Sequence, residues 1–266
     1  MTSGPTLRDA EDGHEAILRV RDVTVRFGGV VALRGVDLSV QPGQVCGLIG
    51  PNGAGKTTLF DVIAGLRYPT EGQVLLGGED VTRRTSTWRA RQGVRRTFQR
   101  QQTFGWLSVE DNLLAAMEWH GGGGGVVPDL LGLPSRKRHA ADRRRRAVDV
   151  LELCGIAHLR AEMAGRLPIG QARMVELARA IVDRPRLLLL DEPTSGLEHR
   201  EADQLGRIVQ DLRRETQCAV LLVEHDVQFV VGQCDRVVVL NLGAVLAQGD
   251  PASIQADERV REAYLG

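Results

Sequence analysis

The chain has 266 residues, of which 42% are hydrophobic and 26% charged, so it can bury a sizeable globular core. Its 34 basic and 34 acidic side chains balance, so no global field attracts nucleic acid and no such partner is expected. No apolar stretch approaches the roughly 18–20 residues that span a bilayer, so any membrane role must act through partners. The four cysteines are far apart and fit buried thiols in a reducing compartment.

The N-terminal part of the chain predicts a disordered segment followed by three strands. Residues 1–15 are polar and contain Gly4, Pro5 and Gly13, which predicts a disordered lead-in. Apolar and charged residues alternate over 17–26 and again over 31–40, which predicts two half-buried strands. A turn at 41–43 then leads into the apolar run 45–49, which predicts a buried strand.

The segment after that strand combines a glycine-rich turn with the start of a helix, the spacing of a phosphate-binding P-loop. Its residues are Gly50, Pro51, Asn52, Gly53, Ala54, Gly55, Lys56, Thr57 and Thr58. Glycines let successive backbone N–H groups approach phosphate oxygens, and the helix N-terminus adds its positive dipole end. Lys56 is expected to reach the β- and γ-phosphates, and the Thr57 hydroxyl is expected to ligate Mg²⁺.

Lysine usage supports this prediction. Lys56 and Lys137 are the only lysines among 34 basic side chains, because the chain uses arginine almost everywhere. A compact ammonium fits a phosphate cradle where a planar guanidinium does not. A glycine-rich turn without a ligand is the alternative. The presence of Lys56 in the loop favours a nucleoside triphosphate, ATP, as the ligand.

The rest of the chain predicts an α/β core with a helical insertion. A turn at 69–72 precedes a short strand at 73–76. Helical patterns at 113–119, 140–154 and 171–182 follow, interrupted by the five glycines at 121–125. The apolar runs at 187–190 and 219–223 suit parallel strands buried on both faces. A closing hairpin is predicted from strands at 237–240 and 244–247.

Two carboxylates end the first of those late apolar runs. Asp191 and Glu192 follow four leucines, a costly position unless a cation or a proton-accepting role uses them. Asp191 is expected near the Mg²⁺ ion, and Glu192 is expected to polarise an attacking water. A solvated strand end is the alternative, and the presence of a P-loop argues against it.

These motifs occur in the order found in ABC-type ATPases, and the resemblance covers about 17–266. It implies an α/β P-loop NTPase core with an N-terminal antiparallel β subdomain and an inserted helical subdomain of about 100–183, all within an ABC ATPase domain at 16–266. It further implies that Phe27 stacks on adenine, that Gln99 joins the Mg²⁺ and water shell, and that His225 contacts the γ-phosphate. Taken singly, Phe27 would be assigned to the core and His225 to a helix cap.

Two further motifs in the resemblance act between subunits. The signature segment comprises Leu167, Pro168, Ile169, Gly170 and Gln171, where the family usually has Leu-Ser-Gly-Gly-Gln. In the family, the serine hydroxyl contacts the γ-phosphate held by the opposite subunit, so Pro168 removes one donor. The D-loop comprises Ser195, Gly196, Leu197 and Glu198, and the last position is often Asp in the family.

Three features narrow the resemblance to the ATPase subunits of branched-chain amino acid importers: Pro168, the run at 96–99 and the ending at 261–266. This implies a second ATPase subunit (identical or a paralogue), membrane permease subunits and, indirectly, an external solute-binding protein. It places the chain at the cytoplasmic face of the inner membrane. Alternatives are an exporter or lipid-extracting transporter ATPase, a soluble ABC ATPase acting on nucleic acid or ribosomes, and an inactive nucleotide sensor.

Two surface patterns leave alternatives open. Phe104 and Trp106 lie in a polar stretch that in this family lines the groove for a permease helix, although ordinary subdomain core is equally compatible. The arginine run at 143–146 fits a solvated helix face, or else a patch facing anionic lipid headgroups.

Overall fold

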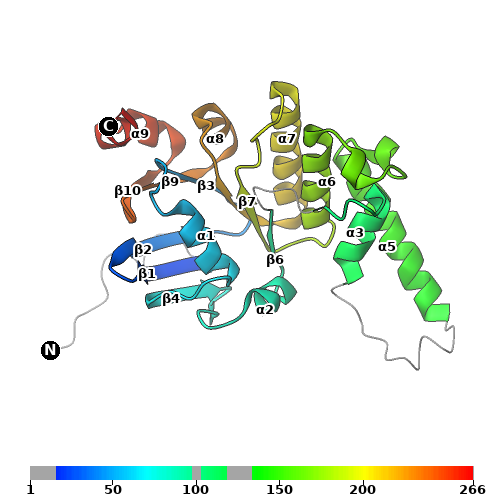
Figure 1. The fold of residues 1–266 in the computed structure, drawn as a ribbon, viewed down its shortest axis with the longest axis horizontal. Coiled ribbons are helices and arrows are strands. Elements are labelled where there is room, and N and C mark those ends of the chain that lie inside the picture. Colours follow the sequence, from blue (N-terminus) through cyan, green and yellow to red (C-terminus); the bar gives the residue numbers. More distant parts are fainter. Residues whose placement is uncertain (1–15, 98–102, 119–133, 266) are drawn as a thin grey trace.

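The computed structural model describes residues 16–97, 103–118 and 134–265, which form two sheets flanked by helices (Figure 1). The predicted lead-in at 1–15 and Gln99 lie outside the described residues. No helix in the described ranges is both long and apolar enough to cross a membrane. All four cysteines are free and buried, as predicted, and burial raises the pKa of the Cys46 thiol to about 12.

The N-terminal sheet is antiparallel, as predicted. It contains β1 (Leu18–Phe27), β2 (Val30–Val40), β4 (Glu71–Leu76) and β5 (Glu79–Asp80), in the order β2-β1-β4-β5. In β1, Leu18 and Val20 are buried, whereas Arg21 is exposed. This alternation gives the sheet one apolar face, against which other elements pack.

The second sheet has the order β10-β9-β3-β8-β7-β6. Its strands are β3 (Val45–Ile49), β6 (Val94–Arg96), β7 (Leu187–Asp191), β8 (Ala219–Val223), β9 (Arg236–Asn241) and β10 (Ala244–Gly249). Only β10 runs antiparallel to its neighbour, which forms the predicted hairpin with β9. Every residue of β3, β7 and β8 is buried, as expected for parallel strands covered on both faces.

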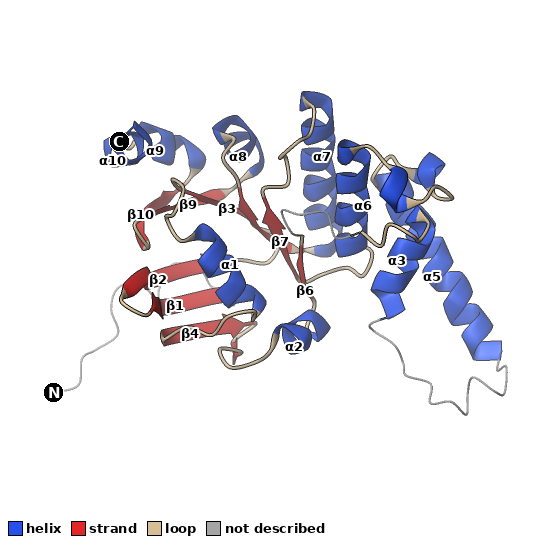
Figure 2. Cartoon of the chain, viewed as in Figure 1, coloured by secondary structure: helices blue, strands red, loops and turns tan. Residues whose placement is uncertain are grey.

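Helix α1 (Lys56–Ala64) lies between the two sheets (Figure 2). Its buried Leu59, Phe60 and Ile63 belong to one apolar cluster with strands of both sheets. The opposite face of the second sheet packs against α6 (Ile169–Ile181) and α7 (His199–Thr216). Helices α3 (Val109–Glu118) and α5 (Pro134–Leu153) lie beyond α6 at one end of the molecule (Figure 1).

Shorter helices complete the fold. They are α2 (Ser86–Arg91), α8 (Val227–Gln233), α9 (Pro251–Ala256) and α10 (Glu258–Leu265). In α5, Arg144 and Arg145 are exposed, whereas Arg143 and Arg146 are half-buried around the buried Ala147. The arginine run therefore spreads around the helix and does not form a single flat face.

Candidate functional site

The chemistry-bearing motifs converge at one edge of the second sheet. The P-loop follows β3, Asp191 and Glu192 stand at the end of β7, and Glu224 and His225 follow β8. These three strands are adjacent and parallel, so their carboxyl ends meet at the same edge. In open α/β sheets this edge is where ligands bind.

Two glycines of the P-loop serve different purposes. A Cβ on Gly50 would lie 2.1 Å from the carbonyl oxygen of Leu240, so the strand β9 leaves no room for a side chain there. Gly53 has φ 80°, a left-handed conformation that favours glycine, and a Cβ there would meet nothing within 4 Å. The loop is therefore packed tightly at its rear and open at Gly53, where a phosphate can approach the backbone.

The turn after β9 also supports the P-loop. The N–H of Gly243 donates to the carbonyl of Ala54 at 3.1 Å, and the carbonyl of Gly243 accepts from the N–H of Arg34 in β2 at 2.7 Å. The closing hairpin thereby joins the phosphate loop to the N-terminal sheet.

The Lys56 side chain is only 7% exposed and lies inside the loop. Its Nζ donates to the carbonyl oxygens of Gly50 at 2.6 Å and Pro51 at 3.0 Å. Burial lowers the pKa of the Lys56 ammonium from its ordinary value, and the negative charges of Glu192 and Asp191 oppose that fall. The lysine and the two acids therefore share one electrostatic environment.

The Asp191 carboxylate is buried and asymmetrically bound. Its Oδ2 accepts a hydrogen bond from Nη2 of Arg96 at 2.9 Å, and Nη1 of the same arginine donates to Oδ1 of Asp61 at 2.6 Å. Oδ1 of Asp191 is buried and has no hydrogen-bond partner among the described residues. A carboxylate oxygen with open lone pairs fits Mg²⁺, which prefers hard oxygen ligands. Thr57, the second candidate ligand, is exposed in the first turn of α1, directly after Lys56.

Glu192 and His225 form a direct pair, with Nε2 of the imidazole 2.8 Å from Oε1 of the carboxylate. Glu192 has φ 47°, an uncommon conformation for a residue with a side chain and one that concentrates at functional sites. Its N–H donates to the carbonyl of Val223 at 2.9 Å, so the neighbouring strand β8 supports this backbone.

Glu224 is a buried acid to which the sequence assigned no role. Its Oε1 accepts from the N–H and the hydroxyl of Thr194 at 2.8 and 2.7 Å, and its Oε2 accepts from the N–H of His225 at 3.0 Å. The carboxylate therefore links the loop after Glu192 to the turn that carries His225. The sequence did contain a signal that could have identified Glu224, because this charged residue directly follows a fully apolar strand.

Replacing Glu224 by Ala should destabilise the fold by about 2 kcal/mol or more, since three donors lose a charged acceptor. The expected fall in Tm is roughly 4–10 °C. Glu224→Gln keeps one acceptor, so its Tm should lie between those of Glu224→Ala and the unaltered protein. Thermal unfolding measures the effect, with the exposed Glu215→Ala as control. Equal Tm values for the two alanine variants would contradict this prediction.

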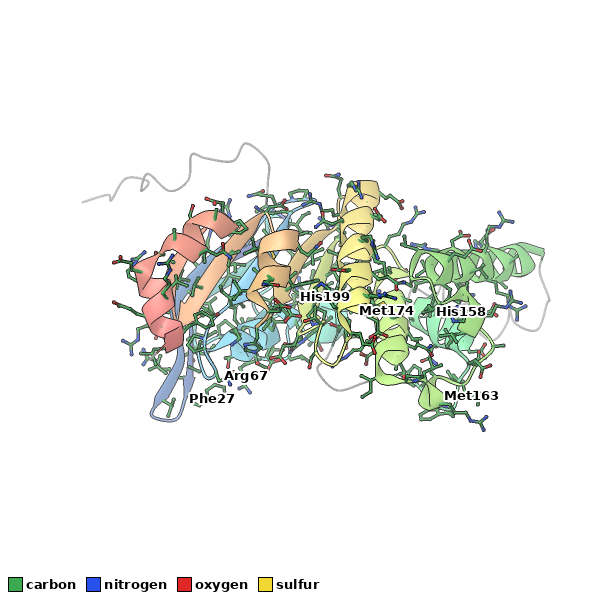
Figure 3. The ribbon with its side chains drawn as sticks, turned by 90° about the horizontal axis from the view of Figure 1, so that it is seen from above. Phe27, Arg67, His158, Met163, Met174 and His199 are labelled. Carbon is green, nitrogen blue, oxygen red and sulfur yellow. The ribbon has the colours of Figure 1, made fainter. Side chains whose placement is uncertain are left out.

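The Phe27 ring lies at the end of β1 and is half-exposed. The guanidinium carbon of Arg67 sits 4.4 Å from the ring centroid, and Figure 3 shows the two side chains together at one end of the molecule. Such a cation–π contact holds an aromatic side chain at the surface. The ring is thus placed outside the core, where a planar base could reach it.

The signature segment opens α6. Pro168 precedes this helix, which begins at Ile169, and Ile169 is 61% exposed. Figure 1 places α6 on the far side of α7 from α1, the helix that follows the P-loop.

The D-loop packs beside the signature segment. A Cβ on Gly196 would lie 3.3 Å from a methyl group of Ile169. Glu198 caps α7, and its N–H donates to Glu201 Oε2 at 2.9 Å. The Glu201 carboxylate in turn leaves no space for a Cβ at Gly170, which would lie 2.0 Å from Oε1. Ser195, Gly196, Leu197 and Glu198 therefore form a second group with the signature residues.

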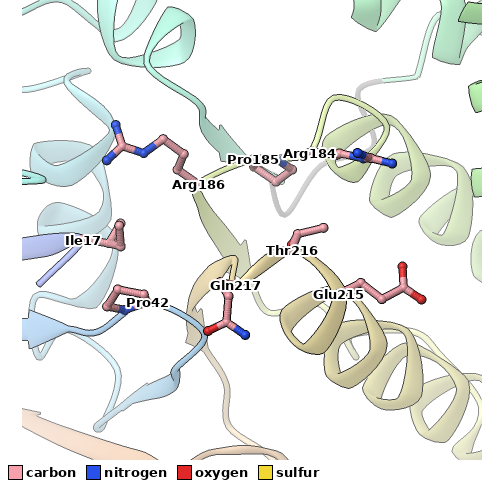
Figure 4. A pocket seen from close by; sticks show the side chains of 8 residues that line it. All are labelled: Ile17, Pro42, Arg184, Pro185, Arg186, Glu215, Thr216 and Gln217. Carbon is pink, nitrogen blue, oxygen red and sulfur yellow. The ribbon is translucent and has the colours of Figure 1, made fainter. Parts of the chain in front are cut away.

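A cavity of about 490 Å³ lies elsewhere (Figure 4). Its lining residues precede β1, β3, β7 and β8, at the amino ends of these strands. They are Ile17, Pro42, Arg184, Pro185, Arg186, Glu215, Thr216 and Gln217. The cavity is therefore at the opposite end of the strands from the P-loop, Asp191 and Glu192.

Comparisons with known proteins agree with the motifs. Residues 33–195 match the ABC transporter family model, and residues 244–266 match that of the branched-chain amino acid ATP-binding cassette transporter. The high-affinity branched-chain amino acid transport ATP-binding protein BraF of Pseudomonas aeruginosa is 40% identical, over 94% of this chain and 98% of its own length. The corresponding protein LivG of Escherichia coli is 38% identical, over 95% and 98%.

A solved structure supports the same assignment. An ATP-binding cassette of an ABC transporter, determined in its ADP conformation, superimposes with a TM-score of 0.80 at 30% identity. The superposition covers 94% of this chain and 99% of the cassette. The predicted P-loop fold class is confirmed. The chain belongs to the ATP-binding cassette family of ABC transporters and is a transport ATPase.

Proposed function

We propose that this chain is the ATP-hydrolysing subunit that energises an importer of branched-chain amino acids or related small solutes. Support comes from BraF and LivG, which are named as branched-chain amino acid transport ATP-binding proteins and align over nearly the whole chain. The observation that carries the chemistry is the Glu192–His225 pair, 2.8 Å apart, beside the buried Lys56 and Asp191.

The P-loop would bind the phosphates of ATP. Backbone N–H groups near Gly53 and the N-terminus of α1 attract phosphate oxygens, and Lys56 exchanges its loop carbonyls for the β- and γ-phosphates. Phe27 would stack on the adenine ring. Thr57 and Asp191, with Gln99 as the expected third residue, would hold Mg²⁺. When bound, this ion would neutralise negative charge on the phosphates.

Hydrolysis would follow from the two acids and the histidine. Glu192 orients a water molecule for in-line attack and accepts its proton. The hydrogen bond to Nε2 of His225 holds the Glu192 carboxylate in place until substrate arrives. His225 and Lys56 then stabilise the negative charge that develops on the transferred phosphoryl group.

A second ATPase subunit would complete the site. The signature segment opens α6, and the exposed Ile169 leaves this surface available to another subunit. Pro168 lacks the hydroxyl that usually contacts the γ-phosphate, which favours pairing with a paralogue that carries a standard signature. In this arrangement residues 16–266 act as one ATPase domain, with a helical subdomain of about 100–183, at the cytoplasmic membrane face.

The permease would contact Phe104 and Trp106. Trp106 is 74% exposed, so the alternative of a core position is wrong for this residue. The two ring centroids are 5.9 Å apart, and the guanidinium carbon of Arg179 lies 4.8 Å from that of Phe104. Exposed aromatic pairs with a charged neighbour are typical of the energetic centres of protein interfaces.

Replacing Trp106 by Ala should leave basal ATP hydrolysis intact while weakening permease binding by about 2 kcal/mol, a factor of roughly 30. Co-purification with the permease subunits and transport-coupled hydrolysis measure the two effects. Tyr68→Ala, an exposed aromatic outside the helical region, serves as control. Unchanged assembly of the Trp106 variant would remove this surface from the permease interface.

Transport itself distinguishes the proposed importer from an exporter or lipid-extracting transporter. The match of residues 244–266 to the branched-chain family model favours import. The chain should be assembled with its permease subunits and binding protein in vesicles and offered labelled leucine, isoleucine and valine. Uptake that requires both ATP and the binding protein supports the proposal, whereas ATP-driven movement in the outward direction alone contradicts it.

A further inference from the structure

Arg96 lies buried between two carboxylates that come from different elements. It ends β6, whereas Asp61 belongs to α1 and Asp191 ends β7. Its Nη1 contacts Oδ1 of Asp61 at 2.6 Å, and its Nη2 contacts Oδ2 of Asp191 at 2.9 Å. The guanidinium carbon also lies 5.6 Å from the centroid of the Phe60 ring. A single cation therefore compensates two acids beside the phosphate loop.

Backbone contacts fix the same junction. Thr97 donates its N–H to the carbonyl of Leu189 at 2.9 Å, and its hydroxyl accepts from the N–H of Asp191 at 3.3 Å. Parallel pairing aligns Arg96 with Leu189, two residues before Asp191. The end of β6 therefore fixes both the backbone and the side chain of Asp191.

The planar fork of arginine determines which oxygen of Asp191 stays open. Because Nη2 occupies Oδ2, the carboxylate cannot rotate without breaking a buried charge-assisted hydrogen bond. Oδ1 is left buried and without a hydrogen-bond partner among the described residues. The Lys56 ammonium at this edge interacts with the carboxylates of both Glu192 and Asp191.

We propose that Arg96 is a positioning residue that holds the Asp191 carboxylate in one orientation, so that Oδ1 is presented to the divalent cation of the bound nucleotide. This inference rests on the proposed nucleotide site and assigns a role to a residue that does not itself touch nucleotide. Without the guanidinium, Oδ2 of Asp191 loses its charge-assisted hydrogen bond, and the carboxylate can rotate. Loss of a hydrogen bond that orients a metal ligand typically weakens metal binding by about 10–100-fold.

The test measures cation binding directly. Mn²⁺ is titrated into the purified chain saturated with ADP, and bound metal is followed by electron paramagnetic resonance. In Arg96→Met, the affinity for Mn²⁺ should be at least about tenfold weaker than in the unaltered protein, since Asp191 loses the hydrogen bond that orients it. ADP affinity without metal should change by less than about threefold.

The neighbouring arginine provides a matched control. Nη2 of Arg95 contacts Oδ2 of Asp183 at 2.5 Å. Successive residues of a strand point to opposite faces of the sheet, so Arg95 and Arg96 lie on different faces of β6. Arg95→Met should therefore bind Mn²⁺ as tightly as the unaltered protein. An Arg96→Met variant with unchanged affinity for Mn²⁺, folded and binding ADP, overturns the inference.

A gentler variant covers the possibility that Arg96→Met does not fold. Arg96→Lys keeps the charge but cannot bridge both carboxylates with a planar fork. It should bind Mn²⁺ about three- to tenfold more weakly than the unaltered protein, and unchanged affinity would overturn the orienting role. Failure of the unaltered protein to bind ADP would instead count against the proposed nucleotide site.

Discussion

Replacing Glu192 by Gln is expected to slow ATP hydrolysis by about 10²–10⁴-fold while preserving ATP binding. The amide keeps the shape of the side chain and can still pair with His225, but it cannot accept a proton from water. A positioned general base contributes this range of rate, which corresponds to about 3–5 kcal/mol of activation free energy. The variant should therefore accumulate as an ATP-bound dimer with its companion subunit.

Single-turnover phosphate release and size-exclusion chromatography with ATP would measure both parts of this result. Glu215→Gln, an exposed acid at the opposite end of the strands, is the control for loss of a negative charge. If Glu192→Gln hydrolyses ATP at a near-normal rate, Glu192 is not the residue that activates water.

Replacing Lys56 by Ala is expected to weaken nucleotide binding itself by about 10–100-fold. The buried ammonium makes two hydrogen bonds to loop carbonyls, and the same donors would serve the β- and γ-phosphates. Hydrogen bonds to charged groups contribute about 1.5–3 kcal/mol, which gives this range of affinity. Burial lowers the pKa of the Lys56 ammonium, and the nearby carboxylates of Glu192 and Asp191 oppose this fall.

Isothermal titration calorimetry with a non-hydrolysable ATP analogue would measure the Lys56→Ala affinity. Lys137→Ala, which removes the only other lysine of the chain, should bind the analogue normally. Lys56→Arg tests the shape argument, because it restores the charge without the compact head group. Unchanged affinity in Lys56→Ala would contradict the assignment of this loop as the phosphate cradle.

The sequence predicted the P-loop and the acids of β7 because their signals are local. A strand, a glycine-rich turn and a helix start are contiguous at 45–58, and the two acids directly follow four leucines. The β9–β10 hairpin was predicted for the same reason, from two apolar runs around a short turn. Each of these elements can be recognised without knowing what packs against it.

Elements that depend on tertiary context were missed. Strand β6 has only three residues, two of them arginines, so it carries no apolar run. Helix α7 is mostly charged, and its buried side chains occur only at Leu205, Ile208, Val209 and Leu212, beside Gly206. Its stability comes from a narrow stripe packed on the sheet, and the stripe was overlooked among the charges.

The contacts that support the site residues could not be predicted from local sequence patterns. Arg96 meets Asp61 and Asp191 across separations of 35 and 95 residues, so no motif links them. Glu224 follows a predicted strand, but its partner Thr194 is 30 residues away. Residues that touch substrate leave motifs, whereas residues that hold them in place become visible only when distant segments are assembled.

The contacts behind the P-loop join segments that are translated at different times. The loop at 50–58 leaves the ribosome long before the carbonyl of Leu240 and the N–H of Gly243 that pack against it. A nascent polypeptide therefore carries the phosphate loop without this backing until the turn after β9 has been synthesised.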